Sequence, residues 1–371
     1  MLIQNAKAFI NGRFQEKTDL LIRDGRISAI GTGLAAEGEE LLDLGGDLLL
    51  PGFVDVHIHA FKGMDTMQGE EAVRHMSREL KKVGVAAFLP TTMSASPEDT
   101  VKALAGVKAV MERPEPDGAI VLGAHMEAPF LAEAKAGAQL KQYFADPNEE
   151  NWQRYTGGLE SVVRLITMAP ERAGAMEFIS ALTKKGITVS IGHTTADAET
   201  THAAAEAGAT HVTHTFNAQT PLNHRAPGVP GAALVDDRLQ CEVISDGIHL
   251  HPDIVKLIIR TKGKEKLVAI TDAMEAAGMP DGQYQLGGQE VFVHEGAARL
   301  KDGTLAGSTL TMIRAFQNLI RFGATPEEAA LMTTKTPALS IGNEELGEIE
   351  LGAPAIFSRF DENYAFKGTV G

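Results

Sequence analysis

The sequence predicts an α/β protein built on a (β/α)8 barrel, with a small β-sandwich domain formed by both ends of the chain. Two observations support this fold. From residue 51 onward, eight short apolar runs alternate with helical stretches, which is the order of strands and helices in such a barrel. The two ends of the chain instead contain short strand-like segments separated by turns. We therefore expect a β-domain from residues 1–50 with 335–371, and a barrel from residues 51–334.

The first fifty residues predict a small antiparallel unit. Strand-like runs cover residues 2–10, 19–31 and 41–53, and the second contains Asp24-Gly25, a typical hairpin turn. The last 25 residues return to short strands and turns. The two ends can form one domain if they meet beside the barrel, as chain termini often do.

The barrel itself is expected to contain eight parallel strands joined by helices. The strands are expected at residues 52–59, 86–91, 120–127, 163–169, 187–193, 210–215, 241–246 and 267–272. Helices are expected between them, for example at residues 69–82, 97–110, 196–207 and 252–259. A strand-like insertion at 283–300 and helices near 308–321 and 325–332 follow the last strand. Because active sites lie at the carboxyl ends of barrel strands, polar residues at these ends are site candidates.

The clearest chemical signal is the pair His57 and His59 at the end of the first barrel strand. Residues i and i+2 of a strand face the same side, so both imidazoles are expected to point into the barrel. Two neutral imidazoles close together suit a divalent transition metal. Taken alone, the pair is equally compatible with two ordinary histidines on a half-exposed strand.

Four more candidates, Glu127, His193, His214 and Asp272, fall at the ends of later strands. The intervals from His59 to Glu127, from Glu127 to His193 and from His214 to Asp272 are 68, 66 and 58 residues. Each spans two strand-helix units, and a typical barrel has roughly 31 residues per unit. The 21 residues from His193 to His214 fit one short unit. This spacing places the candidates around one mouth and predicts a metal centre there.

The ligand types also predict the chemistry. A catalytic metal keeps an open position for water and lowers the pKa of that water toward about 7. Asp272 can take a proton from the water and return it to a leaving group, so we predict cleavage of an acyl bond by metal-activated hydroxide. The alternative for Asp272 is a helix N-cap. The fourth strand has no lysine that could bridge two metals, so Glu127 is the candidate bridge.

The motifs around these residues resemble the N-acetylglucosamine-6-phosphate deacetylase family of the amidohydrolase superfamily. The resemblance runs from PGFVDVHIHAFKGMDTM through GAHMEAPFL, GHTTAD, THVTHTFNAQTPLNHRAPGVPGAAL, ISDGIHLHP and AITDAMEAAGMPDGQYQLGG to DGTLAGSTLTM. It covers most of the chain. It implies hydrolysis of N-acetyl-D-glucosamine 6-phosphate to D-glucosamine 6-phosphate and acetate, a step of amino-sugar catabolism.

The resemblance implies that Glu127, His193 and His214 bind the metal and that Asp272 is the general acid and base. Because it keeps the earlier histidine pair, the chain resembles the branch of the family that can hold two ions. We expect one or two divalent cations per subunit, with zinc favoured and iron, cobalt or manganese as alternatives.

The resemblance also implies a set of substrate contacts. They are Ala138, Gln139, Asn217, Ala218, Arg225, His249, Leu305, Ala306 and Gly307. Arg225 and His249 would hold the phosphate, partly across the interface of a homodimer, because a guanidinium fork and an imidazolium both donate to phosphate oxygens.

Three positions depart from the usual pattern of the family. Ala128 stands where glycine is usual, Gln219 where methionine is common and Ala226 where glutamate is common. Gln139 replaces a histidine that single-metal members use to polarise the acetyl carbonyl, so Gln139 or a second metal would take that role. These departures leave the metal ligands intact and leave the galactosamine epimer open as the substrate.

Composition sets further limits. The 371 residues include 34 Lys and Arg against 49 Asp and Glu, a formal net charge of −15, which excludes a general nucleic-acid binder. Cys241 is the single cysteine, so no intramolecular disulfide can form. No apolar run approaches 18 residues and no signal peptide is recognisable, so we expect a cytoplasmic protein without a membrane partner.

Two alternatives to deacetylation fit the sequence less well. Deamination of a purine ring uses similar barrel ligands, but the phosphate pair Arg225 and His249 argues against it. A non-catalytic, metal-dependent sugar-phosphate binding protein would be expected to have lost Asp272 or a metal ligand, and none is lost.

Overall fold

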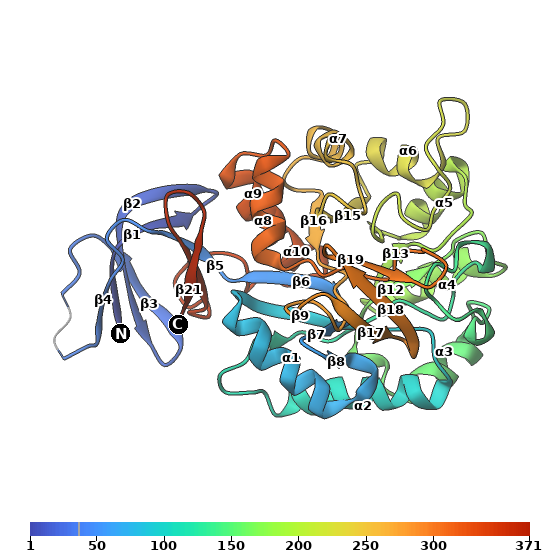
Figure 1. Cartoon of the computed structure of the whole chain (residues 1–371), viewed down its shortest axis with the longest axis horizontal. Coiled ribbons are helices and arrows are strands. Elements are labelled where there is room, and N and C mark those ends of the chain that lie inside the picture. The colour runs from blue at the N-terminus through green and yellow to red at the C-terminus, as the bar shows by residue number, and fades with distance from the viewer. Residues whose placement is uncertain (36–37) are drawn as a thin grey trace.

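A barrel and a smaller sheet lie side by side in the computed structural model, which describes residues 1–35 and 38–371 (Figure 1). The sheet contains both ends of the chain, coloured blue and dark red, and the barrel contains the segments between them. This arrangement confirms the predicted fold class. In the described residues, no helix has the length and apolar character needed to cross a membrane.

Eight parallel strands form the barrel, as predicted. They are β6 (Phe53–Ile58), β9 (Val85–Thr92), β11 (Ala124–Met126), β12 (Val163–Met168), β13 (Thr188–Ile191), β14 (His211–Val212), β15 (Gln240–Ile244) and β16 (Leu267–Ile270). The short β10 (Ile120–Val121) pairs with β9 just before β11 does. All residues of β6 and β9 are buried, as expected for strands covered by helices on the outside and by packed side chains inside.

The barrel closes between its first and last strands. The Asp272 amide donates to the His57 carbonyl at 2.8 Å, and the His59 amide donates to the Ala273 carbonyl at 3.0 Å. Ser308 then continues this seam, because its amide donates to the Asp272 carbonyl at 2.8 Å. The ends of the first and last barrel strands are therefore held in register at the mouth.

Ten α-helices occur in the described residues. They are α1 (Glu70–Lys82), α2 (Pro97–Glu112), α3 (Glu149–Thr156), α4 (Ala175–Lys184), α5 (Ala198–Ala207), α6 (Gly228–Val235), α7 (Pro252–Lys262), α8 (Met312–Arg321), α9 (Pro326–Thr333) and α10 (Lys335–Ser340). Side-chain caps define several starts, such as Ser96 at α2 and the Thr325–Glu328 capping box at α9. The helix expected from residue 308 begins only at Met312, because Ser308 belongs to the barrel seam and Thr311 caps α8.

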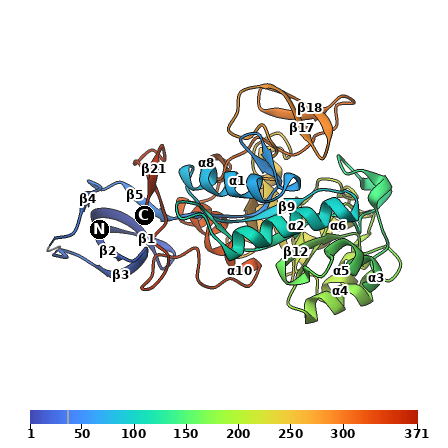
Figure 2. The same ribbon diagram turned by 90° about the horizontal axis from the view of Figure 1, so that it is seen from below.

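The predicted insertion forms a three-stranded antiparallel sheet. Its strands are β17 (Gly282–Leu286), β18 (Gln289–His294) and β19 (Ala297–Leu300), and Figure 2 shows them projecting from the barrel. Leu286 and Val291 of this sheet pack against Met93 and Met274, which follow β9 and β16. The sheet is thus attached to the mouth of the barrel. A smaller pair, β7 (Ala60–Phe61) and β8 (Met64–Asp65), follows β6.

The smaller domain is a seven-stranded sheet. Its strands are β1 (Leu2–Ile10), β2 (Arg13–Arg23), β3 (Arg26–Gly31), β4 (Leu41–Asp43), β5 (Leu48–Pro51), β20 (Phe357–Phe360) and β21 (Phe366–Val370). β5 pairs with β20 and so joins the two chain ends. Strands from both halves of the sheet share one core that includes Ile3, Leu20 and Phe357, as in a sandwich. The predicted domain boundaries at residues 50 and 335 stay a prediction. The helix α10, which begins at residue 335, packs against β6 and β16 of the barrel.

Candidate metal centre and active site

The predicted ligands meet at the carboxyl ends of the barrel strands. Glu127 directly follows β11, whereas His193, His214 and Asp272 each lie two residues beyond a strand. These three have positive φ angles of 47°, 28° and 50°, a region that non-glycine residues rarely occupy. Left-handed residues at the ends of β13, β14 and β16 turn the chain just where the side chains enter the barrel. Such strained positions are characteristic of functional sites.

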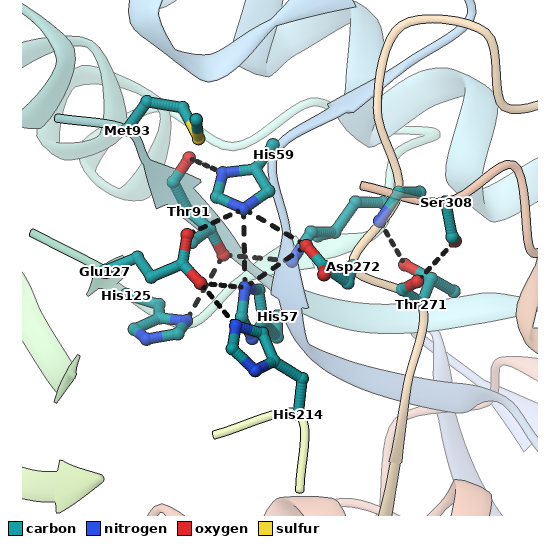
Figure 3. Close-up of polar contacts among 12 residues, drawn as sticks. His57, His59, Thr91, Met93, His125, Glu127, His214, Thr271, Asp272 and Ser308 are labelled. Carbon is teal, nitrogen blue, oxygen red and sulfur yellow. Dashed lines mark hydrogen bonds and ion pairs between the residues drawn. The ribbon is translucent and has the colours of Figure 1, made fainter. Parts of the chain in front are cut away.

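Glu127 lies at the centre of the cluster. Its Oε1 is 3.2 Å from His193 Nε2 and 3.0 Å from His214 Nε2, and its Oε2 is 3.2 Å from His59 Nε2. Figure 3 shows the imidazoles of His57, His59 and His214 gathered around this carboxylate. Two groups of buried ligand atoms result, one from His57, His59 and Glu127 and the other from Glu127, His193 and His214. Glu127 belongs to both groups, as a ligand bridging two cations would.

The outer nitrogens of two of the imidazoles are anchored by backbone acceptors. His193 Nδ1 lies 2.8 Å from the Lys135 carbonyl oxygen, and His59 Nδ1 lies 3.3 Å from that of Thr91. A carbonyl oxygen only accepts, so each Nδ1 carries the proton and each Nε2 presents a lone pair to the cluster. This is how histidines that bind metals are commonly oriented.

The inner nitrogens of the imidazoles lie close to one another in pairs. An Nε2 that carries no proton cannot donate a hydrogen bond to another such Nε2. His193 Nε2 and His214 Nε2 are 3.1 Å apart, and His57 Nε2 and His59 Nε2 are 3.4 Å apart. In each pair the lone pairs of the two Nε2 atoms face each other beside the Glu127 carboxylate. A cation placed between them would be bound by both nitrogens and by the carboxylate. The donor set of imidazole nitrogen and carboxylate oxygen therefore fits one or two divalent transition metals.

The charges of the cluster point the same way. Burial lowers the pKa of His57 and His59, but the effect of the Asp272 and Glu127 carboxylates is larger. As a result, the pKa of His57 lies well above its ordinary value, and the pKa of His59 rises to about 9. Burial raises the pKa of Glu127, but the surrounding imidazoles outweigh it and hold this pKa well below its usual range. The buried carboxylates thus attract positive charge to this point, as they would attract a metal ion.

A cavity of about 320 Å³ opens above the cluster. The predicted residues that line it are His59, Glu127, Ala138, Gln139, His193, His214, Asn217, Ala218, His249, Asp272, Leu305 and Gly307. His57 is fully buried beneath it, and Ala306 is buried in the core that attaches the three-stranded sheet. Arg225 does not line the cavity and stands on an exposed loop, residues 221–227. Met93, Lys135, Leu286 and Thr304 also line the cavity and were not predicted.

Two polar side chains of the cavity are held by specific partners. The amide nitrogen of Gln139 donates to Glu127, and its oxygen accepts from the Ser94 amide at 2.7 Å. His249 Nδ1 lies 2.7 Å from Asp246 Oδ2, and Asp246 Oδ1 also accepts from the backbone amide of His249 at 2.9 Å. Asp246 therefore fixes the ring so that Nε2 is the nitrogen left free.

Two of the residues that depart from the family pattern have local partners. Gln219 is buried, and it holds the loop after β14 by accepting from the Phe216 amide at 3.0 Å and donating to the Thr213 carbonyl at 2.8 Å. Ala226 pairs with Asn223 through both backbone groups in the exposed loop. Ala128 is buried beside Glu127, and nothing in the structure explains an alanine there.

Three buried polar side chains beneath the ligands were missed by the sequence prediction. His125 packs edge-on against His57 with ring centroids 4.5 Å apart, Glu242 contacts His57 Nδ1 at 3.1 Å, and Asp55 accepts from the Thr271 hydroxyl at 2.6 Å. Alternation was the available signal, since His125 and Asp55 lie two residues before Glu127 and His57 and so face the same side. Glu242 is a single charge inside an apolar strand.

Known proteins are similar to this chain in sequence and in fold. A model of the amidohydrolase family matches residues 48–368. An N-acetylglucosamine-6-phosphate deacetylase of Lysinibacillus sphaericus is 36% identical over 377 residues, covering 100% of this chain and 96% of the relative. An N-acetylgalactosamine-6-phosphate deacetylase of Escherichia coli O157:H7 is also 36% identical, covering 91% of this chain and 88% of the relative.

A solved structure is similar over the whole chain. It is that of an aspartate-to-alanine mutant of N-acetyl-D-glucosamine-6-phosphate deacetylase from Mycobacterium smegmatis in complex with N-acetyl-D-glucosamine-6-phosphate. The TM-score is 0.92 at 31% sequence identity, and the match covers 100% of this chain and 97% of the other.

Proposed function

The chain belongs to the amidohydrolase family, and we propose that it is a metal-dependent deacetylase of N-acetyl-D-glucosamine 6-phosphate. The observation that carries this proposal is the pair of buried ligand groups that share Glu127 at the floor of a cavity also lined by Asp272. Relatives with 36% identity over nearly their full length are named for this activity.

The metal ligands divide into two sets. His57, His59 and Glu127 would hold one ion, and Glu127, His193 and His214 would hold the other. When bound, such ions acidify water and polarise a carbonyl oxygen. Zinc is our preferred ion because imidazole and carboxylate donors suit it, and the same donors accept iron, cobalt or manganese.

Asp272 would move the protons. Its Oδ1 is 3.2 Å from His59 Nε2 and 3.4 Å from His57 Nε2, so the carboxylate lies between the ligands and the open cavity. There it can accept a proton from the water that adds to the acetyl carbon, and return it to the nitrogen as the carbon–nitrogen bond breaks. The acetamide and one water then yield acetate and the free amine.

The remaining cavity residues would bind the sugar phosphate. His249, oriented by Asp246, presents Nε2 to the cavity and can donate to phosphate when protonated. Gln139, held on Glu127, lies close to the reacting acetyl group in this scheme. Ala138, Asn217, Ala218, Leu305 and Gly307 form the walls. We place the reaction in the cytoplasm, as a step of amino-sugar catabolism, because phosphorylated sugars are retained inside cells.

Arg225 would act across a subunit interface. It stands exposed on the loop at residues 221–227 and does not line the cavity of its own chain, which supports a role in the cavity of a neighbouring copy. We therefore propose a homodimer in which the phosphate is held by His249 of one subunit and Arg225 of the other. The net charge of −15 does not oppose this, because local charges a few ångströms away outweigh a diffuse and screened surface charge.

The test is acetate release from N-acetyl-D-glucosamine 6-phosphate, measured with and without a chelator. We expect turnover that the chelator abolishes and added Zn²⁺ restores. The galactosamine epimer is the second candidate, because a relative with the same identity is named for it, and the ratio of kcat/KM on the two epimers decides between them. Metal-loaded protein that releases acetate from neither epimer would overturn the proposal.

A further inference from the structure

A buried carboxylate lies behind the metal ligands and takes no part in the chemistry proposed so far. Glu242 of β15 is fully buried, and its Oε2 lies 3.1 Å from His57 Nδ1 and 3.3 Å from the backbone nitrogen of His214. Its Oε1 has no hydrogen-bond partner in the described part of the chain. A half-satisfied buried carboxylate destabilises a fold unless positive charge lies nearby, so its position calls for an explanation.

The carboxylate controls the orientation of His57. It accepts the proton of Nδ1, which leaves Nε2 as the free nitrogen, 3.4 Å from Glu127 Oε1. His125 packs edge-on against the His57 ring, with ring centroids 4.5 Å apart. His57 is therefore fixed between the ring of His125 and a carboxylate, with Nε2 directed at the ligand cluster.

The two ligand groups differ in what stands behind them. His59 and His193 are anchored by backbone carbonyls, which supply a dipole, and His214 Nδ1 has no partner among the described residues. Of these four histidines, His57 alone has a carboxylate from the described residues behind it. The extra negative charge therefore falls on the group made of His57, His59 and Glu127.

The buried charge also exceeds what one ion can balance. Glu127, Asp272 and Glu242 together provide three carboxylates in or directly behind the cluster. One divalent cation leaves one of these charges uncompensated inside the barrel. That remaining negative charge would attract a second cation beside His57, and two divalent cations against three carboxylates give a sum of +1.

We propose that Glu242 is a positioning residue that raises the affinity of the His57–His59–Glu127 group for a divalent cation, so that this chain holds two ions. The inference rests on the metal centre of the proposed function. Carboxylates that orient a metal-binding histidine typically change metal affinity by about 10–100-fold, and an effect of this size is expected here.

The experiment compares metal binding by wild-type protein, Glu242→Gln and Asp55→Asn. Glutamine keeps the shape of Glu242 but removes its charge. Asp55 is a matched control, since it is also fully buried below the cluster but accepts only from backbone amides and the Thr271 hydroxyl. Chelated protein is titrated with Co²⁺, whose visible spectrum reports each site, and bound Zn²⁺ per subunit is measured after gel filtration.

We expect two ions in wild-type protein and in the Asp55 variant. In Glu242→Gln the first ion should bind as in wild type, and the Kd of the second should rise by about 10–100-fold. An unchanged second Kd would overturn the inference and leave the proposed deacetylase intact. Wild-type protein that binds no divalent cation would instead overturn the metal centre itself.

A melting experiment separates positioning from a general structural role. The metal-free Glu242→Gln variant should melt no lower than metal-free wild type, because it lacks the unpaired charge, and it should gain less than wild type from added Zn²⁺. An equal loss of melting temperature in both forms would contradict the inference. If Glu242→Gln does not fold, Glu242→Asp keeps the charge but withdraws it from His57, and an unchanged second Kd in that variant would contradict it equally.

Discussion

Replacing Asp272 by asparagine should remove proton transfer and leave the metal centre in place. The two groups of ligand atoms do not include Asp272, and asparagine keeps the size of the side chain and an oxygen near His57 and His59. Asparagine cannot accept a proton from water or deliver one to the leaving nitrogen. We therefore expect full metal content when the metal is supplied in excess, and a large fall in kcat.

The size of the fall follows from the role. General acid–base catalysis contributes about 10²–10⁴-fold to rate, which corresponds to about 2.7–5.4 kcal/mol of activation free energy. Among the described residues, Asp272 is the carboxylate that touches the ligand histidines and lines the cavity without joining either ligand group. No other residue in that part of the chain is placed to replace it. We expect kcat on N-acetyl-D-glucosamine 6-phosphate to fall within that range.

The assay is steady-state acetate release together with metal analysis of the same sample. Asp197→Asn is the matched control, because Asp197 is an exposed N-cap of α5 and asparagine caps helices equally well. A kcat for Asp272→Asn within tenfold of wild type, at full metal content, would refute the assigned role. Loss of metal in this variant would show instead that Asp272 is a required ligand.

Three further outcomes follow from the same geometry. Glu127→Gln should lose both ions, because Glu127 belongs to both ligand groups, and metal analysis finding one tightly held ion would contradict this. Asp246→Asn should raise KM by about tenfold with kcat nearly unchanged, because it removes a charged hydrogen bond that orients His249. Steady-state kinetics test this prediction, and a fall in kcat alone would argue against it. Burial raises the pKa of the Cys241 thiol to about 11, so a thiol reagent at pH 8 should react only after unfolding, and rapid labelling of native protein would contradict its placement.

The positions of the proposed ligands could be predicted because each position depends on local rules. Alternation along a strand places His57 and His59 on one face, and the spacing of strand-helix units places Glu127 at the same height. The prediction did not need the shape of the barrel, only that carboxyl ends of parallel strands share one mouth. What the spacing could not provide is the pair of ligand groups around Glu127, which depends on side-chain direction.

Glu242 was missed because its position depends on a contact between strands that are far apart in the sequence. Glu242 and His57 are 185 positions apart. They touch because only β16 lies between β15 and β6 in the closed barrel, and interior side chains of alternate strands share one layer. Arg225 shows a different limit of sequence analysis. The resemblance implied that it contacts phosphate, but only the fold shows that Arg225 does not line the cavity of its own chain. Sequence spacing fixes the position of a residue along a strand but not the interior neighbour opposite it.

Barrel closure links the fold to the chemistry. His57 and His59 belong to the first strand, whereas Asp272 follows the last, and the seam between them is held by the Asp272 amide donating to the His57 carbonyl. On its other side, Asp272 accepts from the Ser308 amide, which ties it to the cavity-lining segment that ends at Gly307. Gly307 has a φ of 64°, and a Cβ there would lie 3.1 Å from the Asp272 carbonyl oxygen, so glycine is needed for this close approach. The histidine pair, the proposed proton-transfer group and one wall of the cavity are thus aligned by a single seam between the first and last strands of the barrel.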